Sequence, residues 1–208
     1  MVSTLLLDLG NVLLYFSHDR MFEQVGTLCN WSKSDVRDLF TEHRIITEFE
    51  CGRMSQADVH RLFESVTGCQ VDRRRLMRAI SNIFTPNEPL LRILDPLKAA
   101  GLRLVLLSNT NAAHYRFIQK QFDLLPKFDE LVLSYKVGAM KPDPPIYEAA
   151  LKAIQCEPHE CFYTDDIVEN VDRARGFGLQ AEVFIDTQTF LAQLQKRNIL
   201  LRDLHKSE

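Results

Sequence analysis

The sequence has no apolar run that approaches the roughly 18 residues of a membrane-spanning helix. Its opening stretch, MVSTLLLDLG, contains no basic residue and reaches Asp8 almost at once, so we expect a buried strand there and no signal peptide. The five cysteines form no CxxC pair, which argues against a zinc site or a disulfide framework. Reduced thiols in a cytoplasmic protein are the simpler expectation.

A basic stripe of the kind that binds nucleic acid is also missing. The formal net charge is −3, the 25 basic residues are spread along the chain, and the densest basic run is the short segment DRRR at residues 72–75. We interpret that run as the solvated face of a helix. The sequence therefore predicts neither a nucleic-acid partner nor a membrane partner, and it leaves the oligomeric state open.

The hydrophobic and charged fractions, 46% and 25%, are typical of a packed globular protein. Short, continuous apolar runs are typical of parallel strands buried on both faces. Five such runs occur, at Thr4–Leu7, Leu102–Leu107, Glu130–Leu133, Cys161–Tyr163 and Ala181–Ile185. Segments with helical periodicity follow four of them, at residues 111–122, 144–154, 167–177 and 187–196. This alternation predicts an α/β fold with a doubly wound, Rossmann-like parallel sheet.

The segment after the first run interrupts this alternation. Between about Tyr15 and Phe84 no strand is evident, and helices are predicted near residues 20–28, 33–40, 55–66 and 73–83. We therefore expect an α/β catalytic core formed by residues 1–14 and 88–208, with a four-helix cap domain at residues 15–87. An insertion at this point lies at the carboxyl end of the sheet, where ligands bind in open α/β folds, so the cap is placed as a lid.

Polar motifs directly follow four of the apolar runs. They are Asp8-Leu9-Gly10-Asn11, Ser108-Asn109-Thr110-Asn111, the segment leading to Lys141-Pro142, and Thr164-Asp165-Asp166. Each alone is typical of a turn or a helix N-cap, but the carboxyl ends of parallel strands meet at one edge, so together they predict one site. Three carboxylates this close need a cation between them, and Mg²⁺ is the hard, oxygen-seeking ion that fits. The remaining lysine and hydroxyl would suit a phosphoryl group.

At these motifs the sequence resembles the haloacid dehalogenase (HAD) superfamily, in the branch with a helical cap after the first motif. The matching segments are DLGNVL at Asp8–Leu13, LLSNTN at Leu106–Asn111, GAMKPDPPIY at Gly138–Tyr147 and YTDDIVENVDRAR at Tyr163–Arg175. The chain is most similar to α-D-glucose-1-phosphate phosphatase-like proteins and to the N-terminal phosphatase domain of epoxide hydrolases. Residues Glu50–Ser55 also resemble a cap helix junction in those proteins.

The resemblance implies covalent catalysis by a carboxylate. Asp8 would attack phosphorus and become an aspartyl-phosphate, and Lys141 would be the second catalytic residue. Ser108, Asn109 and Lys141 would bind the phosphoryl oxygens.

The resemblance also implies a Mg²⁺ site. Its ligands would be Asp8, Asp165, Asp166 and the backbone carbonyl of Gly10, without a decision on which of Asp165 and Asp166 binds directly. Asn170 would support the site, because it lies one helical turn after Asp166 and can face back toward it.

One position departs from the family pattern. The usual first motif is Asp-x-Asp, whose second Asp is the general acid and base, and here that position is Gly10. General acid–base catalysis typically supplies about 10²–10⁴-fold in rate. We therefore predict a preference for anomeric, acyl and aryl phosphates, whose leaving oxygens need little protonation, over primary alkyl phosphates.

The sequence thus predicts a Mg²⁺-dependent phosphohydrolase of small phosphorylated metabolites, with a sugar-1-phosphate phosphatase as the finer expectation. The alternative that Gly10 keeps open is a catalytically weak HAD-fold protein that binds a ligand or a partner. Five polar side chains of the cap and core are candidate specificity residues: His18, Arg20, Arg44, Glu48 and His114.

Overall fold

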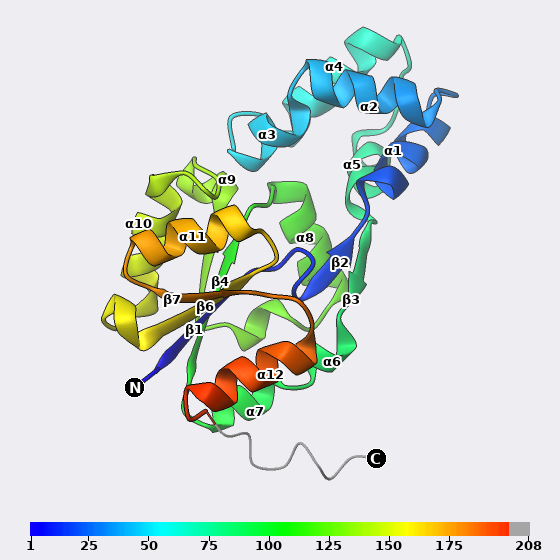
Figure 1. Ribbon diagram of the computed structural model, residues 1–208. Coiled ribbons are helices and arrows are strands. Elements are labelled where there is room, and N and C mark those ends of the chain that lie inside the picture. Colours follow the sequence, from blue (N-terminus) through cyan, green and yellow to red (C-terminus); the bar gives the residue numbers. More distant parts are fainter. Residues whose placement is uncertain (200–208) are drawn as a thin grey trace.

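A computed structural model of the chain describes residues 1–199 and shows a five-stranded parallel sheet (Figure 1). The strand order is β5-β4-β1-β6-β7. The strands are β1 (Thr4–Leu7), β4 (Arg103–Ser108), β5 (Glu130–Leu133), β6 (Cys161–Asp165) and β7 (Gln180–Val183). All four strand pairs are parallel, which confirms the expected sheet. The part of the expected core at residues 200–208 lies outside the described residues.

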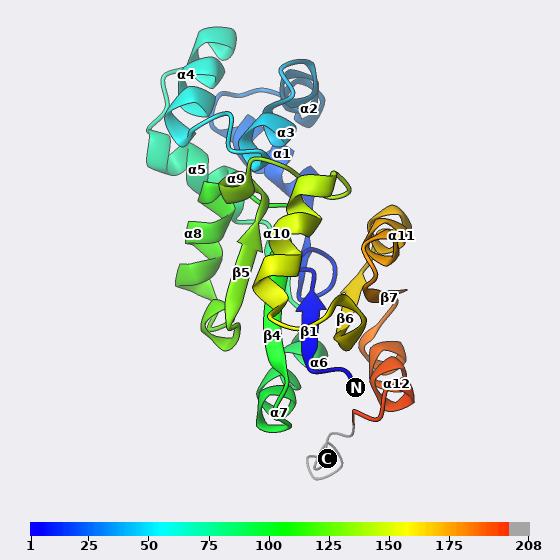
Figure 2. The same ribbon diagram turned by 90° about the vertical axis from the view of Figure 1, so that its left-hand side faces the viewer.

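Helices cover both faces of this sheet, because alternate strand residues point to opposite sides. Leu5 and Leu7 of β1 share a buried cluster with residues of α6 (Glu88–Leu91), α7 (Leu94–Ala99), α8 (Ala112–Gln121) and α12 (Thr187–Lys196). Leu6 instead packs with residues of α10 (Pro144–Ile154) and α11 (Val168–Gly176) on the other face. The resulting three layers are a doubly wound α/β fold, and Figure 2 shows its strands side by side from β5 to β7 with α10 in front of them.

Short helical segments complete the core. They are η1 (Leu125–Lys127), α9 (Ser134–Val137) and η2 (Pro158–Glu160). These three segments, with α6 and α7, are not among the elements that the sequence predicts. The four predicted core helices match α8, α10, α11 and α12 to within a residue or so at each end.

A helical cap rises beyond the carboxyl end of the sheet (Figure 1). It consists of α1 (His18–Thr27), α2 (Lys33–Glu42), α3 (Ile45–Glu50), α4 (Gln56–Thr67) and α5 (Arg73–Ser81). These helices bury a hydrophobic cluster that includes Phe40, Phe63 and Leu76, to which the core helix α8 adds only Ala113. The sequence predicts four of the five. The fifth, α3, has only six residues and no side-chain cap at its start, so it gives little periodic signal.

Cap and core are joined by a two-stranded antiparallel ribbon, where the sequence predicts no strand. Its strands, β2 (Leu14–Phe16) and β3 (Phe84–Pro86), have three residues each, which is too short for a recognisable alternation. Residues 15–87 remain our proposed boundaries for the cap as a domain. Within residues 1–199, no helix has both the length and the apolar character needed to cross a membrane.

Candidate active site

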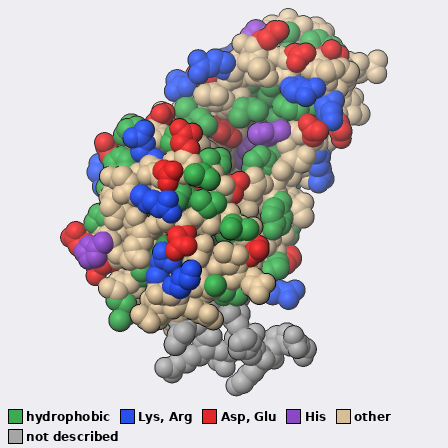
Figure 3. All heavy atoms as spheres, in the orientation of Figure 1, with side chains coloured by type: hydrophobic (Ala, Val, Ile, Leu, Met, Phe, Trp, Pro, Cys, Tyr) green, Lys and Arg blue, Asp and Glu red, His purple; other side chains and the backbone are tan. Residues whose placement is uncertain are grey.

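The sequence-predicted site residues meet at the carboxyl ends of β1, β4 and β6, where all of them except Asp165 border a cavity of about 200 Å³. Its core wall includes Asp8, Ser108, Lys141 and Asp166. The ribbon contributes the aromatic rings of Phe16 and Phe84, and the cap contributes His18 and Glu50. The space-filling view in Figure 3 shows acidic and histidine side chains in the recess between the two lobes of the molecule.

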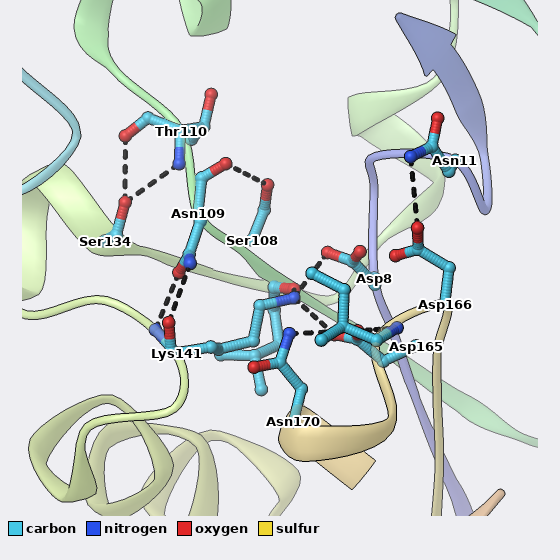
Figure 4. Close-up of polar contacts among 12 residues, drawn as sticks. Asp8, Asn11, Ser108, Asn109, Thr110, Ser134, Lys141, Asp165, Asp166 and Asn170 are labelled. Carbon is cyan, nitrogen blue, oxygen red and sulfur yellow. Dashed lines mark hydrogen bonds and ion pairs between the residues drawn. The ribbon is translucent and has the colours of Figure 1, made fainter. Parts of the chain in front are cut away.

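Lys141 joins the first and fourth motifs by ion pairs (Figure 4). Its Nζ lies 2.6 Å from Oδ1 of Asp8 and 2.6 Å from Oδ2 of Asp165, and it also donates to the carbonyl of Leu107 at 3.2 Å. The three ionised side chains are almost completely buried. Each of the ammonium group's three protons therefore has an acceptor, which fixes the lysine in place.

Burial and charge act against each other at this cluster. Burial raises the pKa of Asp8 to about 7, although the Lys141 ammonium opposes that shift. Burial would lower the pKa of Lys141, but the charges of Asp8 and Asp165 outweigh it and raise that pKa, so the lysine stays protonated. For Asp165, burial is outweighed by Lys141 and by hydrogen bonds, and its pKa falls below the usual value. The cluster is therefore built around a permanent cation.

Asp165 is held by protein groups on both of its oxygens. Oδ1 accepts the backbone N–H of Ile167 at 2.9 Å and the amide of Asn170 at 3.0 Å. Oδ2 accepts the hydroxyl of Tyr163 in addition to Lys141. Asn170 thus faces back into the site as the sequence predicts, although its contact is with Asp165 rather than Asp166. Asp165 has little free lone-pair capacity.

Asp166 is far less engaged. Its Oδ2 accepts the amide of Asn11 at 3.0 Å, which ties the first motif to the fourth, and its side chain is only partly buried. One carboxylate oxygen from each of Asp8, Asp165 and Asp166 can be chosen so that all three lie within 4.8 Å of one another. Such a set of hard oxygen ligands fits a divalent metal ion. We note that Asp166 offers that ion the freer carboxylate.

The second motif lies beside Asp8. Ser108 ends β4, and its buried hydroxyl is near the cavity, with the carbonyl of Asn109 as its acceptor at 3.3 Å. The side chain of Asn109 exchanges hydrogen bonds with the backbone of Lys141: it accepts the N–H at 2.8 Å and donates to the carbonyl at 3.0 Å. Asn109 therefore positions the lysine. Its second amide proton and its backbone N–H have no partner among residues 1–199 and are available to a ligand.

Gly10 sits where an aromatic ring approaches the chain. A Cβ at this position would lie 2.8 Å from Cε1 of Phe16, which is closer than real side chains come. The backbone of Gly10 is not in the left-handed region; the positive φ, 53°, belongs to Asn11. The glycine is thus explained by the neighbouring ring and not by backbone conformation.

The five proposed specificity residues divide into two groups. His18 and His114 line the cavity, whereas Arg20, Arg44 and Glu48 do not. Both ring nitrogens of His114 have partners, the amide of Asn111 at 3.1 Å and the carbonyl of Ile80 at 3.3 Å, and burial lowers its pKa to about 4. Glu48 is paired with Arg53 at 2.6 Å instead.

Sequence reasoning gave no role to several residues that the structure brings to the site. Asn11 and Tyr163 contact the acidic cluster, and Glu50 projects from the cap into the same cavity. Asn11 and Tyr163 lie inside the motif segments, so their positions were a usable signal. For Glu50, the signal was its place at the start of the segment Glu50–Ser55 that resembles a cap helix junction.

Comparisons with known proteins identify relatives of this chain. Bifunctional epoxide hydrolase 2 of Sus scrofa is 33% identical over 114 residues, which cover 53% of this chain but only 20% of that protein. D-ribitol-5-phosphate phosphatase of Bacteroides thetaiotaomicron is 27% identical over 191 residues, covering 86% of this chain and 90% of that protein. The chain thus spans about a fifth of the epoxide hydrolase and most of the bacterial phosphatase.

The fold has a close structural counterpart as well. A HAD family enzyme from Bacteroides thetaiotaomicron, solved in complex with magnesium and inorganic phosphate, superposes with a TM-score of 0.81 at 24% identity, covering 90% of this chain and 96% of that one. The family model of the haloacid dehalogenase-like hydrolases matches residues 2–178. The chain belongs to the haloacid dehalogenase-like hydrolase family.

Proposed function

We propose that this protein is a Mg²⁺-dependent phosphohydrolase of small phosphorylated metabolites, with Asp8 as the nucleophile. The observation that carries the proposal is the pairing of a buried, cavity-facing Asp8 with Lys141 inside a three-carboxylate cluster. The relative named D-ribitol-5-phosphate phosphatase and the neighbour solved with magnesium and phosphate support it.

Mg²⁺ fits the donor set at the sheet edge. Asp8, Asp166 and the carbonyl of Gly10 would hold the ion, and Asp165 would act mainly by orienting Lys141 and Asn170. When bound, the ion supplies positive charge that offsets the negative charge of the phosphoryl group and of Asp8.

The protein's own residues would carry the covalent chemistry. Ser108 and Asn109 would donate hydrogen bonds to the phosphoryl oxygens, Lys141 would bind them through its charge, and together they would hold phosphorus in line with Asp8. The Asp8 carboxylate would attack phosphorus, the bond to the leaving oxygen would break, and an aspartyl-phosphate would form. Water would then hydrolyse this intermediate, releasing inorganic phosphate and restoring Asp8.

The substrate is proposed only as a class. The cavity of about 200 Å³ is lined both by polar groups and by the aromatic rings of Phe16 and Phe84, which suits a small phosphorylated sugar or polyol. Sugar-1-phosphates remain the finer proposal, because their hemiacetal leaving oxygen depends less on an acid than the primary alcohol of a sugar-6-phosphate does.

A phosphate-release screen tests the function. The purified protein is assayed with Mg²⁺ against sugar phosphates, polyol phosphates, nucleotides and acyl phosphates, and each active substrate is repeated after exhaustive chelation. We expect release with at least one class and its loss on chelation. Activity that survives chelation would contradict the metal-dependent scheme, and no release from any substrate would favour the alternative of a ligand-binding protein.

A further inference from the structure

The cap carries a carboxylate that the roles above leave unused. Glu50 is the last residue of α3 and lines the cavity together with Asp8 and Lys141. It is partly buried, and residues 1–199 provide its carboxyl group with no hydrogen-bond or ion-pair partner. Its carboxyl group is not among the fully buried, unpartnered side-chain atoms of the described residues, so it remains open to the cavity and available to a bound substrate.

Position 10 of the core carries no acid. The ring of Phe16 occupies the space that a side chain there would need, since a Cβ on Gly10 would lie 2.8 Å from it. That ring packs edge-on against the ring of His18, with 5.1 Å between centroids, and at a tilt against the ring of Phe84, with 6.4 Å between centroids. A proton donor for the leaving group must therefore come from another part of the cavity wall.

Three titratable groups on the described wall are not assigned to phosphate or metal: His18, His114 and Glu50. Both nitrogens of His114 are engaged, and burial keeps its pKa near 4. Burial likewise lowers the pKa of His18, against the opposing charge of Asp19, which disfavours its protonated form. The protonated imidazole is thus disfavoured at both histidines, and Glu50 is the remaining candidate.

The surroundings of Glu50 favour a proton donor. Burial raises its pKa to about 7, with Lys141 lowering it and Asp8 raising it, and His18 of α1 lines the same cavity. A carboxyl group with such a pKa is present in both protonation states near neutral pH, as an acid that later acts as a base requires.

A close contact between cap and core fixes α3 over the site. Gly52, two residues after Glu50, approaches the core helix α9 so tightly that a Cβ would lie 2.3 Å from the carbonyl oxygen of Tyr135. Its φ of +69° is also one that glycine adopts readily. The end of α3 is therefore seated directly on the core, and Glu50 is held at the cavity by backbone contact.

We propose that Glu50 is the general acid and base of this enzyme, supplied by the cap in place of the acid that is absent at position 10. The inference rests on the proposed phosphohydrolase function. As Asp8 attacks phosphorus and the bond to the leaving oxygen breaks, Glu50 gives its proton to that oxygen and the alcohol departs neutral. Glu50, now a carboxylate, takes a proton from the water that attacks the aspartyl-phosphate. Phosphate leaves, the Asp8 carboxylate is restored and Glu50 is protonated again.

The test is a comparison of leaving groups in Glu50→Gln and in the matched control Glu48→Gln. Glu48 lies on the same helix, is paired with Arg53 and does not line the cavity. Each protein is assayed with 4-nitrophenyl phosphate, whose leaving oxygen needs no proton, and with the primary alkyl phosphate that the wild type hydrolyses fastest. Thermal melting checks that each variant is folded.

For Glu50→Gln we expect kcat/KM to fall about 10²–10³-fold with the alkyl phosphate and by less than about tenfold with the aryl phosphate. A burst of nitrophenolate approaching one per enzyme should also appear, because the aspartyl-phosphate accumulates when its attacking water lacks a base. Glu48→Gln should stay within about twofold of the wild type on both substrates. The preference for anomeric, acyl and aryl phosphates that the sequence predicts should therefore be strong in Glu50→Gln and weak in the wild type.

Equal losses on both substrates without a burst, or no loss at all, would overturn the role of Glu50. If Glu50→Gln does not fold, Glu50→Ala with added formate serves instead, and failure of formate to restore alkyl phosphate hydrolysis counts against the proposal. A wild-type protein that hydrolyses neither substrate would defeat the proposed function itself, which is a separate outcome.

Discussion

The sheet edge and the cap reach the same cavity by different means. In the core, Asp8, Ser108 and Asp165 come together because three neighbouring parallel strands end at one edge, so their proximity follows from topology. In the cap, Glu50 reaches the site because α3 rests on α9 through Gly52 and Tyr135. The place of a carboxylate on the sheet edge is set by strand register, whereas the place of one on the cap is set by how the cap packs against the core. A nucleophile suits the first position, and an acid that acts on the leaving group suits the second.

The largest effect is expected at the sheet edge, from Asp8→Asn. An amide cannot attack phosphorus, so turnover should fall by about 10³-fold or more with every substrate, aryl or alkyl. The fold should persist, because the amide can still accept a hydrogen bond from Lys141. Phosphate release and thermal melting provide the measurements. A folded Asp8→Asn protein with near-wild-type activity would show that another group is the nucleophile.

Next in size is the loss of the buried cation in Lys141→Met. This leaves Asp8 and Asp165 buried without their partner, which typically costs about 3–5 kcal/mol of stability and should also abolish activity. Lys127→Met is the control, because Lys127 pairs with the exposed Asp95 at the surface, where an ion pair contributes about 0–1 kcal/mol.

The destabilisation by Lys141→Met should grow with pH. The pKa of Asp8 is already raised to about 7 by burial, and without the lysine charge it rises further. A carboxyl group whose pKa is higher in the folded than in the unfolded state destabilises the protein progressively as pH rises above its unfolded value, about 4. Urea unfolding at pH 5 and pH 8 in the presence of chelator measures this. A larger deficit at pH 5 would contradict the assignment of the ion pair.

The sheet edge could be predicted from the sequence more fully than the cap, for physical reasons. Buried parallel strands are continuous apolar runs, and the polar motifs that follow β1, β4 and β6 mark their ends. By contrast, α3 has six residues and the ribbon strands have three each, so these elements are too short to show a recognisable hydrophobic periodicity. The direction in which Glu50 faces depends on how the cap packs against α9, which is a tertiary contact that local pattern does not encode. The aromatic ring beside Gly10 is likewise brought there by the ribbon.

A smaller effect is expected where the cap is seated, from Gly52→Ala compared with Gly68→Ala. The two glycines have nearly equal φ values, +69° and +68°, so alanine meets the same backbone strain at both, about 1–2 kcal/mol. A Cβ at Gly52 also strikes Tyr135, whereas nothing lies within 4 Å of one at Gly68. We expect about a tenfold loss of kcat/KM with alkyl phosphates for Gly52→Ala only, because α3 must shift away from the site. Equal activities and melting temperatures in the two variants would mean that this contact does not position Glu50.

The smallest effect is expected from an attempt to return the acid to the core, with Gly10→Asp. The new Cβ would meet Phe16 at 2.8 Å, so the ring must turn before the carboxyl group can reach the cavity. The variant alone should therefore gain little activity, within about threefold, and should melt at a lower temperature because of the strain.

A second substitution, Phe16→Leu, removes the ring. In the Glu50→Gln background, Gly10→Asp together with Phe16→Leu should restore part of the lost activity on alkyl phosphates. Phe16→Leu with Glu50→Gln but without the new aspartate is the control and should restore none. Recovery by the aspartate would show that position 10 and the cap serve the same leaving oxygen. If Gly10→Asp alone restored full activity in the Glu50→Gln background, the steric explanation for the glycine would be wrong, because the Phe16 ring would then move aside at little cost.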